Sequence, residues 1–324
     1  MTIRISGTGS ALPEKILTNA ELEKTVDTSD AWIRERTGIG ERHIAEKETA
    51  ASLAAEACRR ALADAGRKAE EVELLIVASC SAEMLFPCTS CQVQGAIGAV
   101  NAAVFDLNAA CSGFLFALQT ANAYIASGMY KNALVVGAEV LSGIVDWKDR
   151  STCVLFGDGA GAVFAEESSE EGMGMLGMIQ GSIGSRGAVL QCRAGHYVDA
   201  ESECFPYKDA YLHMNGGEVY KFAVRQVPEC IEEVLERAGI PAEDIELYVL
   251  HQANIRIIEA IAKRLGIEAE RFPYNLDRVG NTSSAAIPLL LDELNKSGKI
   301  RRGMKLVLAG FGAGLSYGAC VMRW

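Results

Sequence analysis

Short apolar runs alternate with amphipathic segments along most of the chain, a pattern typical of an α/β protein. The apolar runs that predict buried strands span residues 72–79, 104–107, 132–137 and 247–250, and the glycine-rich segment 155–164 leads into one more strand. The segments that predict helices span residues 19–26, 31–36, 49–65, 90–98 and 114–125. Residues 114–125 are apolar on nearly every side, so we expect that helix to expose little surface.

The second half of the sequence repeats part of the first. Residues 62–76 align with residues 235–249, and seven of the fifteen aligned positions are identical. The glycine-rich segment 156–161 aligns in turn with residues 311–316. Two copies of one strand-and-helix unit predict a duplicated α/β fold, and the absence of a long linker predicts two halves packed as one body. The predicted halves are residues 1–168 and residues 169–324.

The composition predicts a globular protein with a sizeable core. The chain has 324 residues, of which 49% are hydrophobic and 23% are charged. Its net charge of −11 leaves no global basic surface, so we do not expect it to bind nucleic acid. The first residues lack the apolar core of a signal peptide, and no apolar run is long enough to span a membrane. We therefore expect a cytoplasmic protein without a membrane partner.

The ten cysteines are scattered through the sequence, many of them in apolar or helical stretches. A chain of this length does not need disulfide bonds to fold, so a reducing cytoplasm is the simplest interpretation. Cys88 and Cys91 form a Cys-x-x-Cys pair. A zinc ribbon would need a second such pair, so we predict no metal site.

The stretch from Asp106 to Phe116 contains the strongest candidate for chemistry, Cys111. This cysteine lies where a predicted strand runs into a predicted helix, among small residues that leave room for a ligand. Unpaired N–H groups and the helix dipole favour negative charge at a helix N-terminus, so we expect the thiol to ionise to the reactive thiolate. A free cysteine is often a small buried hydrophobe, however, and this stretch alone leaves that alternative open.

Two polar residues at the ends of predicted elements are candidate partners for Cys111. His251 follows an apolar strand, and catalytic groups lie at the carboxyl ends of such strands in α/β proteins. Asn281 precedes a turn rich in Ser and Thr. Taken singly, His251 also fits a satisfied core residue and Asn281 a helix cap. In the glycine-rich segment 309–314, a backbone N–H could form an oxyanion hole together with the Cys111 N–H.

Two groups of residues share helix faces and have two interpretations each. Trp32 and Arg36 are four residues apart, so they fit either an adenine platform or a surface packing pair. Arg256 and Lys263 are seven residues apart on a later helix, with Arg264 beside them. These three fit either a basic patch for an acidic protein or a solvated helix face.

In combination, Cys, His and Asn in this order are far more specific than any one of them. The chain resembles β-ketoacyl-acyl-carrier-protein synthase III, an initiating condensing enzyme of the thiolase superfamily, over essentially its whole length. The segments that carry the resemblance are residues 28–39, 108–114, 156–162, 251–254 and 280–283. In the related branches, thiolases have a Cys-His-Cys arrangement and elongating synthases have a Cys-His-His arrangement. Plant-type polyketide synthases share Cys-His-Asn but carry a proline in the final glycine loop, where this chain has Ala313.

The resemblance implies a thiolase-like fold, a layered α-β-α-β-α body of two duplicated halves, and a two-step Claisen condensation. Cys111 would take an acyl group from acyl-CoA, and malonyl-acyl carrier protein would lose CO2 so that its carbanion attacks the acyl-cysteine. His251 and Asn281 would stabilise the negative charge that develops, and the Ala313 N–H would be the oxyanion donor that pairs with the Cys111 N–H. The implied role is the initiating step of type II fatty acid synthesis. A related condensing enzyme or acyltransferase of secondary metabolism, of polyketide or quinolone type, is the alternative.

The resemblance also implies the remaining contacts. The CoA thioester would be a substrate, with no further cofactor, and the residues implied to bind it are Thr28, Trp32, Arg36, Arg150, Gly216, Asn254 and Phe311. Because acyl carrier proteins are acidic, the patch of Arg256, Lys263 and Arg264 becomes the expected carrier-protein surface. The apolar loop at residues 84–87 implies a homodimer, in which Phe86 reaches the acyl pocket of the neighbouring subunit.

Overall fold

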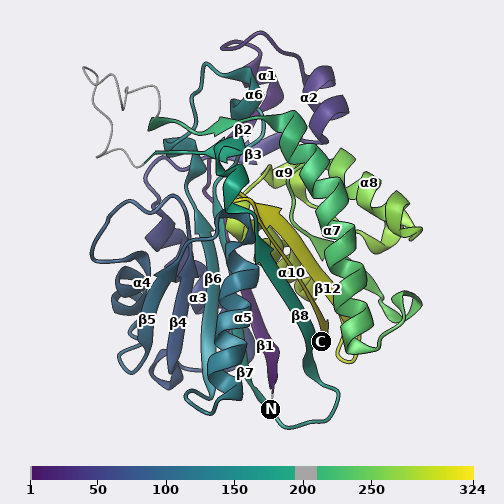
Figure 1. Cartoon of the computed structure of the whole chain (residues 1–324). Coiled ribbons are helices and arrows are strands. Elements are labelled where there is room, and N and C mark those ends of the chain that lie inside the picture. Colours follow the sequence, from purple (N-terminus) through teal and green to yellow (C-terminus); the bar gives the residue numbers. More distant parts are fainter. Residues whose placement is uncertain (1, 194–209) are drawn as a thin grey trace.

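Two mixed β-sheets form the centre of the molecule in this computed structural model, which describes residues 2–193 and 210–324 (Figure 1). The strand order is β1-β7-β6-β4-β5 in the first sheet and β11-β12-β13-β8 in the second. The strands of the first sheet are β1 (Thr2–Ala11), β4 (Leu74–Ala78), β5 (Ala103–Leu107), β6 (Asn132–Glu139) and β7 (Gly159–Ser168). Those of the second sheet are β8 (Gly174–Ser182), β11 (Leu247–Leu250), β12 (Lys305–Gly312) and β13 (Ser316–Arg323). Two small ribbons pair β2 (Ile16–Thr18) with β3 (Glu41–His43) and β9 (Leu190–Gln191) with β10 (His213–Met214).

The helices pack on both faces of each sheet. They are α1 (Asn19–Leu22), α2 (Asp30–Thr37), α3 (Ala50–Ala65), α4 (Thr89–Ile97), α5 (Gly113–Ala126), α6 (Arg150–Cys153), α7 (Gly216–Ala238), α8 (Ile255–Leu265), α9 (Leu276–Val279) and α10 (Ala286–Lys296). None of the helices in the described ranges is long and apolar enough to cross a membrane.

Alternate residues of the central strands face different helices, and this separates the helices into three layers. In β4, Ile76 packs into the core that contains residues of α5 and α10, whereas Val77 packs into the core that contains residues of α3. In β12, Leu308 joins the first of these cores, and Val307 joins the core that contains residues of α7 and α8. Helices α5 and α10 therefore lie between the two sheets, which confirms the predicted α-β-α-β-α layering (Figure 1).

The predicted duplication is visible in the two sheets. The order β1-β7-β6-β4 corresponds to β8-β13-β12-β11, and each pair of neighbouring strands is parallel or antiparallel in the same way in both sheets. The aligned helices α3 and α7 end alike, at Gly66 with φ 64° and at Gly239 with φ 65°. Positive φ of this kind favours glycine, which is why the glycine recurs in both copies. The boundary at residues 168 and 169 stays a prediction.

Two local predictions differ from the structure. The sequence predicts a helix over residues 19–26, but α1 ends at Leu22 and the chain continues in turns, in which the Thr25 and Val26 N–H groups both donate to the Leu22 carbonyl. The sequence also predicts a buried strand at 104–107. Strand β5 is there, but it lies at the edge of its sheet and its residues are half-buried or exposed.

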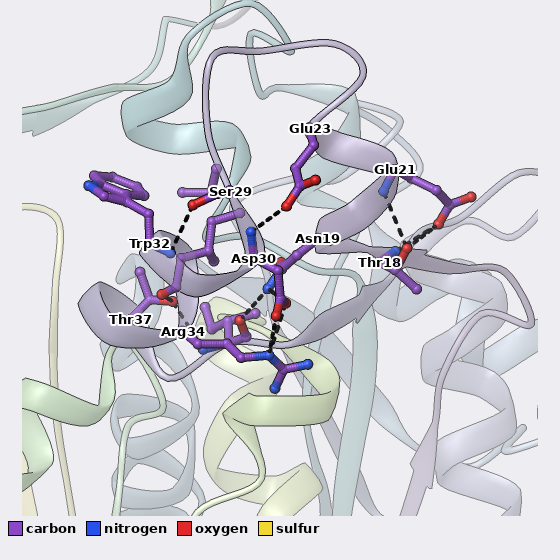
Figure 2. Close-up of polar contacts among 12 residues, drawn as sticks. Thr18, Asn19, Glu21, Glu23, Ser29, Asp30, Trp32, Arg34 and Thr37 are labelled. Carbon is purple, nitrogen blue, oxygen red and sulfur yellow. Dashed lines mark hydrogen bonds and ion pairs between the residues drawn. The ribbon is translucent and has the colours of Figure 1, made fainter.

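Polar caps set the position of α2, the helix that holds Trp32. The Ser29 hydroxyl accepts the Trp32 N–H at 3.2 Å, and Gly38 ends the helix with φ 82° (Figure 2). Asp30 pairs with Arg34 one turn later at 2.9 Å. Figure 2 shows the Trp32 ring pointing away from this ion pair. The capped helix therefore presents its aromatic side chain on a different side from the ion pair of Asp30 and Arg34.

Candidate active site

Cys111 lies in a tight turn between the edge strand β5 and the helix α5. Residues Ala110–Ser112 form a 3-10 turn, in which Ala110 has a φ of 47° that non-glycine residues rarely adopt. The end of β12 packs directly on this turn, since a Cβ atom added at Gly312 would lie 2.7 Å from the Cys111 nitrogen. The turn and β12 together hold the thiol close to the start of α5, with 9% of the residue exposed.

A cavity of about 520 Å³ brings the three predicted catalytic residues together. Cys111, His251 and Asn281 all line it, although they come from distant segments of the chain. His251 directly follows β11, and its N–H donates to the Ala309 carbonyl at 2.9 Å, which extends the parallel pairing with β12 by one residue. The strand end therefore fixes the direction in which the imidazole leaves the backbone.

Asn281 is held through its backbone and through one end of its side chain. Its N–H donates to the Leu155 carbonyl at 2.8 Å, and its own carbonyl accepts from the Gly157 N–H at 3.0 Å. Its side-chain oxygen accepts the Ser283 N–H at 2.9 Å. The cap of α10 is Ala285, so Asn281 is not the cap of that helix. The side-chain NH2 group remains as the donor that Asn281 can offer to a ligand.

The Cys111 thiol is protonated at rest, contrary to the expectation from its place near a helix N-terminus. Burial raises its pKa to about 12, and the nearby Glu139 carboxylate also raises it. Hydrogen bonds from the Ser283 hydroxyl and the Cys111 N–H act in the opposite direction but are outweighed. Removal from water and the Glu139 carboxylate thus oppose the ionisation that the nearby helix end was expected to favour.

His251 is a neutral imidazole at ordinary pH. Burial lowers its pKa from 6.5 to about 3. Its ring meets the Phe311 ring edge to face at 5.4 Å, and its Nδ1 has no hydrogen-bond partner in the described part of the chain. A neutral imidazole can accept a proton at one nitrogen while it donates a hydrogen bond from the other. His251 can therefore serve both a proton transfer and the stabilisation of an oxyanion.

Comparisons with known proteins agree with this geometry. A family model described as 3-oxoacyl-[acyl-carrier-protein (ACP)] synthase III matches residues 105–184, and the model of its C-terminal part matches residues 235–324. The β-ketoacyl-[acyl-carrier-protein] synthase III of Clostridium acetobutylicum is 50% identical over 323 residues, which are 100% of this chain and 99% of that protein. This chain belongs to the β-ketoacyl-[acyl-carrier-protein] synthase III family. It is an acyltransferase of the condensing-enzyme type.

Solved structures of the synthase III family have the same fold. The 3-oxoacyl-[acyl-carrier-protein] synthase III of Aquifex aeolicus is 44% identical with a TM-score of 0.93, and the match covers 99% of this chain and 100% of that one. The priming β-ketosynthase from the R1128 polyketide biosynthetic pathway is 36% identical with a TM-score of 0.93, over 99% and 96% of the two chains. The predicted thiolase-like fold is thus confirmed.

Most residues that the synthase III resemblance assigns to CoA lie around the same cavity as Cys111. Those that line it are Trp32, Arg36, Arg150, Gly216, Asn254 and Phe311. The guanidinium group over the Trp32 ring belongs to Arg150, at 4.9 Å from the ring centroid. Thr28 is not among the lining residues, but its buried hydroxyl has no partner in residues 2–193 and 210–324. The structure brings these residues together, and their contact with CoA stays a prediction.

Two of the predicted binding residues also have structural contacts. The Asn254 side chain donates to the Arg36 carbonyl at 2.9 Å and accepts the Arg256 N–H at 2.9 Å, so it caps α8 and ties it to α2. Arg264 donates to the Val224 carbonyl at 3.1 Å and pairs with Glu229 at 3.1 Å, which ties α8 to α7.

Arg256 and Lys263 are both accessible on the predicted carrier-protein surface. Both are exposed on α8, and Arg256 lines the cavity that holds Cys111. A positive side chain at the edge of the cavity fits an acidic partner that delivers a substrate there. The role of the patch in carrier-protein binding stays a prediction.

A second cavity, of about 290 Å³, also reaches Cys111. Ala313 lines it beside Cys111, and the role of the Ala313 N–H as an oxyanion donor stays a prediction. Its apolar lining residues include Leu141, Ile144, Leu190 and Leu212. Phe86 lines neither cavity of its own chain and is 83% exposed. Within the described residues, no group of three or more His, Cys, Asp or Glu side chains is placed to hold a metal ion.

The sequence analysis missed a buried polar group behind the site. Glu139 ends the apolar strand β6, is fully buried, and accepts hydrogen bonds from Ser283 and Ser284, which follow Asn281. A carboxylate at the end of a buried strand is the signal that could have marked this residue, because buried charges require partners.

Proposed function

We propose that this chain carries out the initiating condensation of type II fatty acid synthesis, with Cys111 as the nucleophile and with His251 and Asn281 as partners of the reacting oxygen. The observation that carries the proposal is that these three side chains line one cavity. The reaction joins an acyl group from acyl-CoA to malonyl-acyl carrier protein and gives 3-oxoacyl-acyl carrier protein, CoA and CO2.

In the first half-reaction, the Cys111 sulfur attacks the thioester carbonyl of acyl-CoA, and the bond between that carbon and the CoA sulfur breaks. Because burial keeps the thiol protonated, its proton has to move during the attack. The neutral His251 in the same cavity accepts this proton and passes it to the leaving CoA sulfur. The Cys111 and Ala313 N–H groups hold the oxyanion of the tetrahedral intermediate.

In the second half-reaction, malonyl-acyl carrier protein loses CO2, and the electron pair of the broken bond forms an enolate. The Asn281 NH2 group and a His251 ring N–H donate to the enolate oxygen. The enolate carbon then attacks the acyl-cysteine carbonyl, the bond to the Cys111 sulfur breaks, and the thiolate takes a proton from solvent. This chemistry needs no resident cofactor, because both acyl groups arrive already activated as thioesters.

The initiation of fatty acid synthesis is favoured over a role in secondary metabolism. Two curated relatives, both β-ketoacyl-[acyl-carrier-protein] synthases III, are 50% and 48% identical to this chain over its whole length. The priming synthase of a polyketide pathway is less similar, at 36% identity. A polyketide-type priming reaction would use the same catalytic residues with a different acyl group.

We propose a cytoplasmic homodimer as the working form. Two observations support the dimer. Strand β5 lies at the edge of the first sheet with half-buried side chains, and Leu85 and Phe86, in the loop between β4 and α4, are 70% and 83% exposed. A second copy paired along β5 would cover these apolar side chains, which water otherwise solvates at a cost in free energy.

The function is tested by following one acyl group through both half-reactions. Incubation with acetyl-CoA should add one acetyl mass to the peptide that contains Cys111. Addition of malonyl-acyl carrier protein should then remove this mass and release CO2 together with 3-oxoacyl-acyl carrier protein. Transfer of the acetyl group to the carrier protein without release of CO2 would contradict a condensing function and indicate a simple acyltransferase.

A further inference from the structure

The Glu139 carboxylate joins segments from both halves of the chain directly behind Cys111. Its Oε1 atom accepts the hydroxyls of Ser283 at 3.1 Å and Ser284 at 2.7 Å, which belong to the second half. Its Oε2 atom accepts the Cys80 N–H at 3.1 Å and the Ser81 hydroxyl at 2.5 Å, in the loop after β4. The two oxygens of one carboxylate therefore hold two different loops at fixed positions relative to each other.

Burial of the Glu139 carboxylate at this position costs free energy. It is fully buried, and none of the ion pairs within residues 2–193 and 210–324 includes it. An ionised carboxylate taken out of water without a cation is stabilised only by the hydrogen bonds that it accepts. A polar network of this kind adds little to stability compared with apolar packing. We therefore expect Glu139 to have a role in the reaction, through the residues that it holds in position.

Ser283 connects this carboxylate to the catalytic residues. Its backbone N–H holds the Asn281 side-chain oxygen at 2.9 Å. Its hydroxyl, which donates to Glu139, lines the same cavity as Cys111 and is close enough to lower the pKa of that thiol. Ser283 adopts a φ of 49°, which a non-glycine residue adopts only where its surroundings hold it there. The turn is pressed closely onto β6, since a Cβ atom added at Gly137 would lie 2.2 Å from the Ser284 carbonyl oxygen.

From these contacts we propose that Glu139 is a positioning residue for the condensation: it holds the turn of residues 281–284 in the conformation that aims the Asn281 NH2 group at the enolate oxygen. The proposal rests on the role given above to Asn281. Glu139 does not touch the substrate, and it acts through Ser283 and Ser284. Loss of its carboxylate should therefore slow decarboxylation through Asn281 and leave the binding of malonyl-acyl carrier protein unchanged.

The test is Glu139→Gln in the full chain, with decarboxylation of malonyl-acyl carrier protein as the readout. Glutamine keeps the volume but replaces one acceptor oxygen with a donor, which must then face the donors of one loop. We expect kcat to fall about ten- to a hundred-fold, because a small misplacement of a catalytic group has effects of this size, with KM within about two-fold of the parent. The control is Asp292→Asn, since Asp292 is also a buried carboxylate that accepts hydroxyls, but it lies in α10, bonded to Thr8 and Ser10 and paired with Lys296. This control should decarboxylate at the parent rate.

A double variant separates positioning from a general loss of stability. If Glu139 acts through Asn281, then Glu139→Gln combined with Asn281→Ala decarboxylates no more slowly than Asn281→Ala alone. Additive losses in the double variant, or a parent-like kcat in Glu139→Gln, would overturn the proposal. Should Glu139→Gln fail to fold, Ser283→Ala removes one of the two turn hydroxyls that bind the intact carboxylate, and the same non-additivity with Asn281→Ala is expected.

The same experiments distinguish this proposal from the proposed function. Asn281→Ala measured alone tests whether Asn281 takes part in decarboxylation at all. A parent-like rate in that variant would contradict the function assigned to Asn281. A normal loss in Asn281→Ala together with a parent-like Glu139→Gln would contradict only the role of Glu139.

Discussion

Ser283 donates its backbone N–H to the side-chain oxygen of Asn281 across 2.9 Å, and this bond decides which end of the amide is left for a ligand. In the reversed orientation, the Asn281 NH2 group would meet another donor. The amide therefore offers N–H groups to the cavity that it shares with Cys111 and His251. An enolate oxygen needs donors, so this single backbone contact suits the site to decarboxylation.

The protonated Cys111 thiol predicts that His251 matters for acyl transfer as well as for decarboxylation. Since burial raises the pKa of the thiol to about 12, a base must take its proton during attack on acyl-CoA. We expect His251→Ala to slow acylation of Cys111 about a hundred-fold or more, the usual size of general-base catalysis. Transfer of radiolabel from acyl-CoA to the protein measures this. Acylation at the parent rate would show that the thiol ionises without help.

His251 should also make stability depend on pH. Its pKa is about 3 when folded and 6.5 ordinarily, so between these values the unfolded chain binds a proton that the folded chain does not. The stabilisation is therefore complete above about pH 6.5 and is lost as the pH falls, by about 1.4 kcal/mol per pH unit.

Urea unfolding of the parent and of His251→Gln at pH 7 and pH 5 tests this dependence. In the variant, the loss of stability between the two pH values should be smaller by up to about 2 kcal/mol, because the buried imidazole is gone. All other titrating groups are shared and cancel in the comparison. An equal loss in both proteins would mean that the imidazole is charged in the folded state.

The basic surface on α8 predicts weaker use of the carrier-protein substrate when its charge is reversed. Arg256→Glu combined with Lys263→Glu should raise the KM for malonyl-acyl carrier protein about ten-fold or more, because like charges then meet an acidic partner. Acylation by a small acyl-CoA should change less. The charge-matched control is Lys299→Glu with Arg301→Glu, at two residues that follow the C-terminal end of α10. This control should leave the KM unchanged. Equal effects of the two pairs would assign the result to net charge.

The exposed loop at residues 84–87 predicts a homodimer in solution. Light scattering at micromolar concentration should give twice the mass of the chain. Phe86→Glu should shift the protein toward the monomer, because a charge would be buried at the interface. Met129→Glu is the control, since Met129 is 61% exposed at the end of α5 away from Cys111. A parent protein that is monomeric would contradict the assignment.

The residues proposed as catalytic could be picked out from the sequence because each lies in a short segment with a recognisable pattern. Cys111 lies between a strand and an apolar helix, and His251 ends an apolar strand that is repeated in sequence. The limits of α3 were also predictable, because Thr49 caps its start and Gly66 ends it with positive φ. These features depend on residues close together in the sequence, which is where local patterns are informative.

What the sequence did not predict depends on contacts between distant segments. The pKa of Cys111 follows from its burial under the end of β12, which no local pattern indicates. The bond between Glu139 and Ser283 joins residues 144 positions apart. The guanidinium over Trp32 comes from Arg150 instead of from Arg36 on the same helix. In each case the helix or strand was predictable, and its partner was set by the packing of the two halves.

The central claim is that Asn281 serves decarboxylation while Cys111 holds the acyl group. The paired measurement on Asn281→Ala and Cys111→Ala tests it, with radiolabel from acyl-CoA on the protein and CO2 from malonyl-acyl carrier protein as the two readouts. Cys111→Ala should take up no label and still release CO2. Asn281→Ala should be labelled but release CO2 about a hundred- to a thousand-fold more slowly, the usual loss of one oxyanion donor. Release of CO2 by Asn281→Ala at the parent rate would contradict the mechanism.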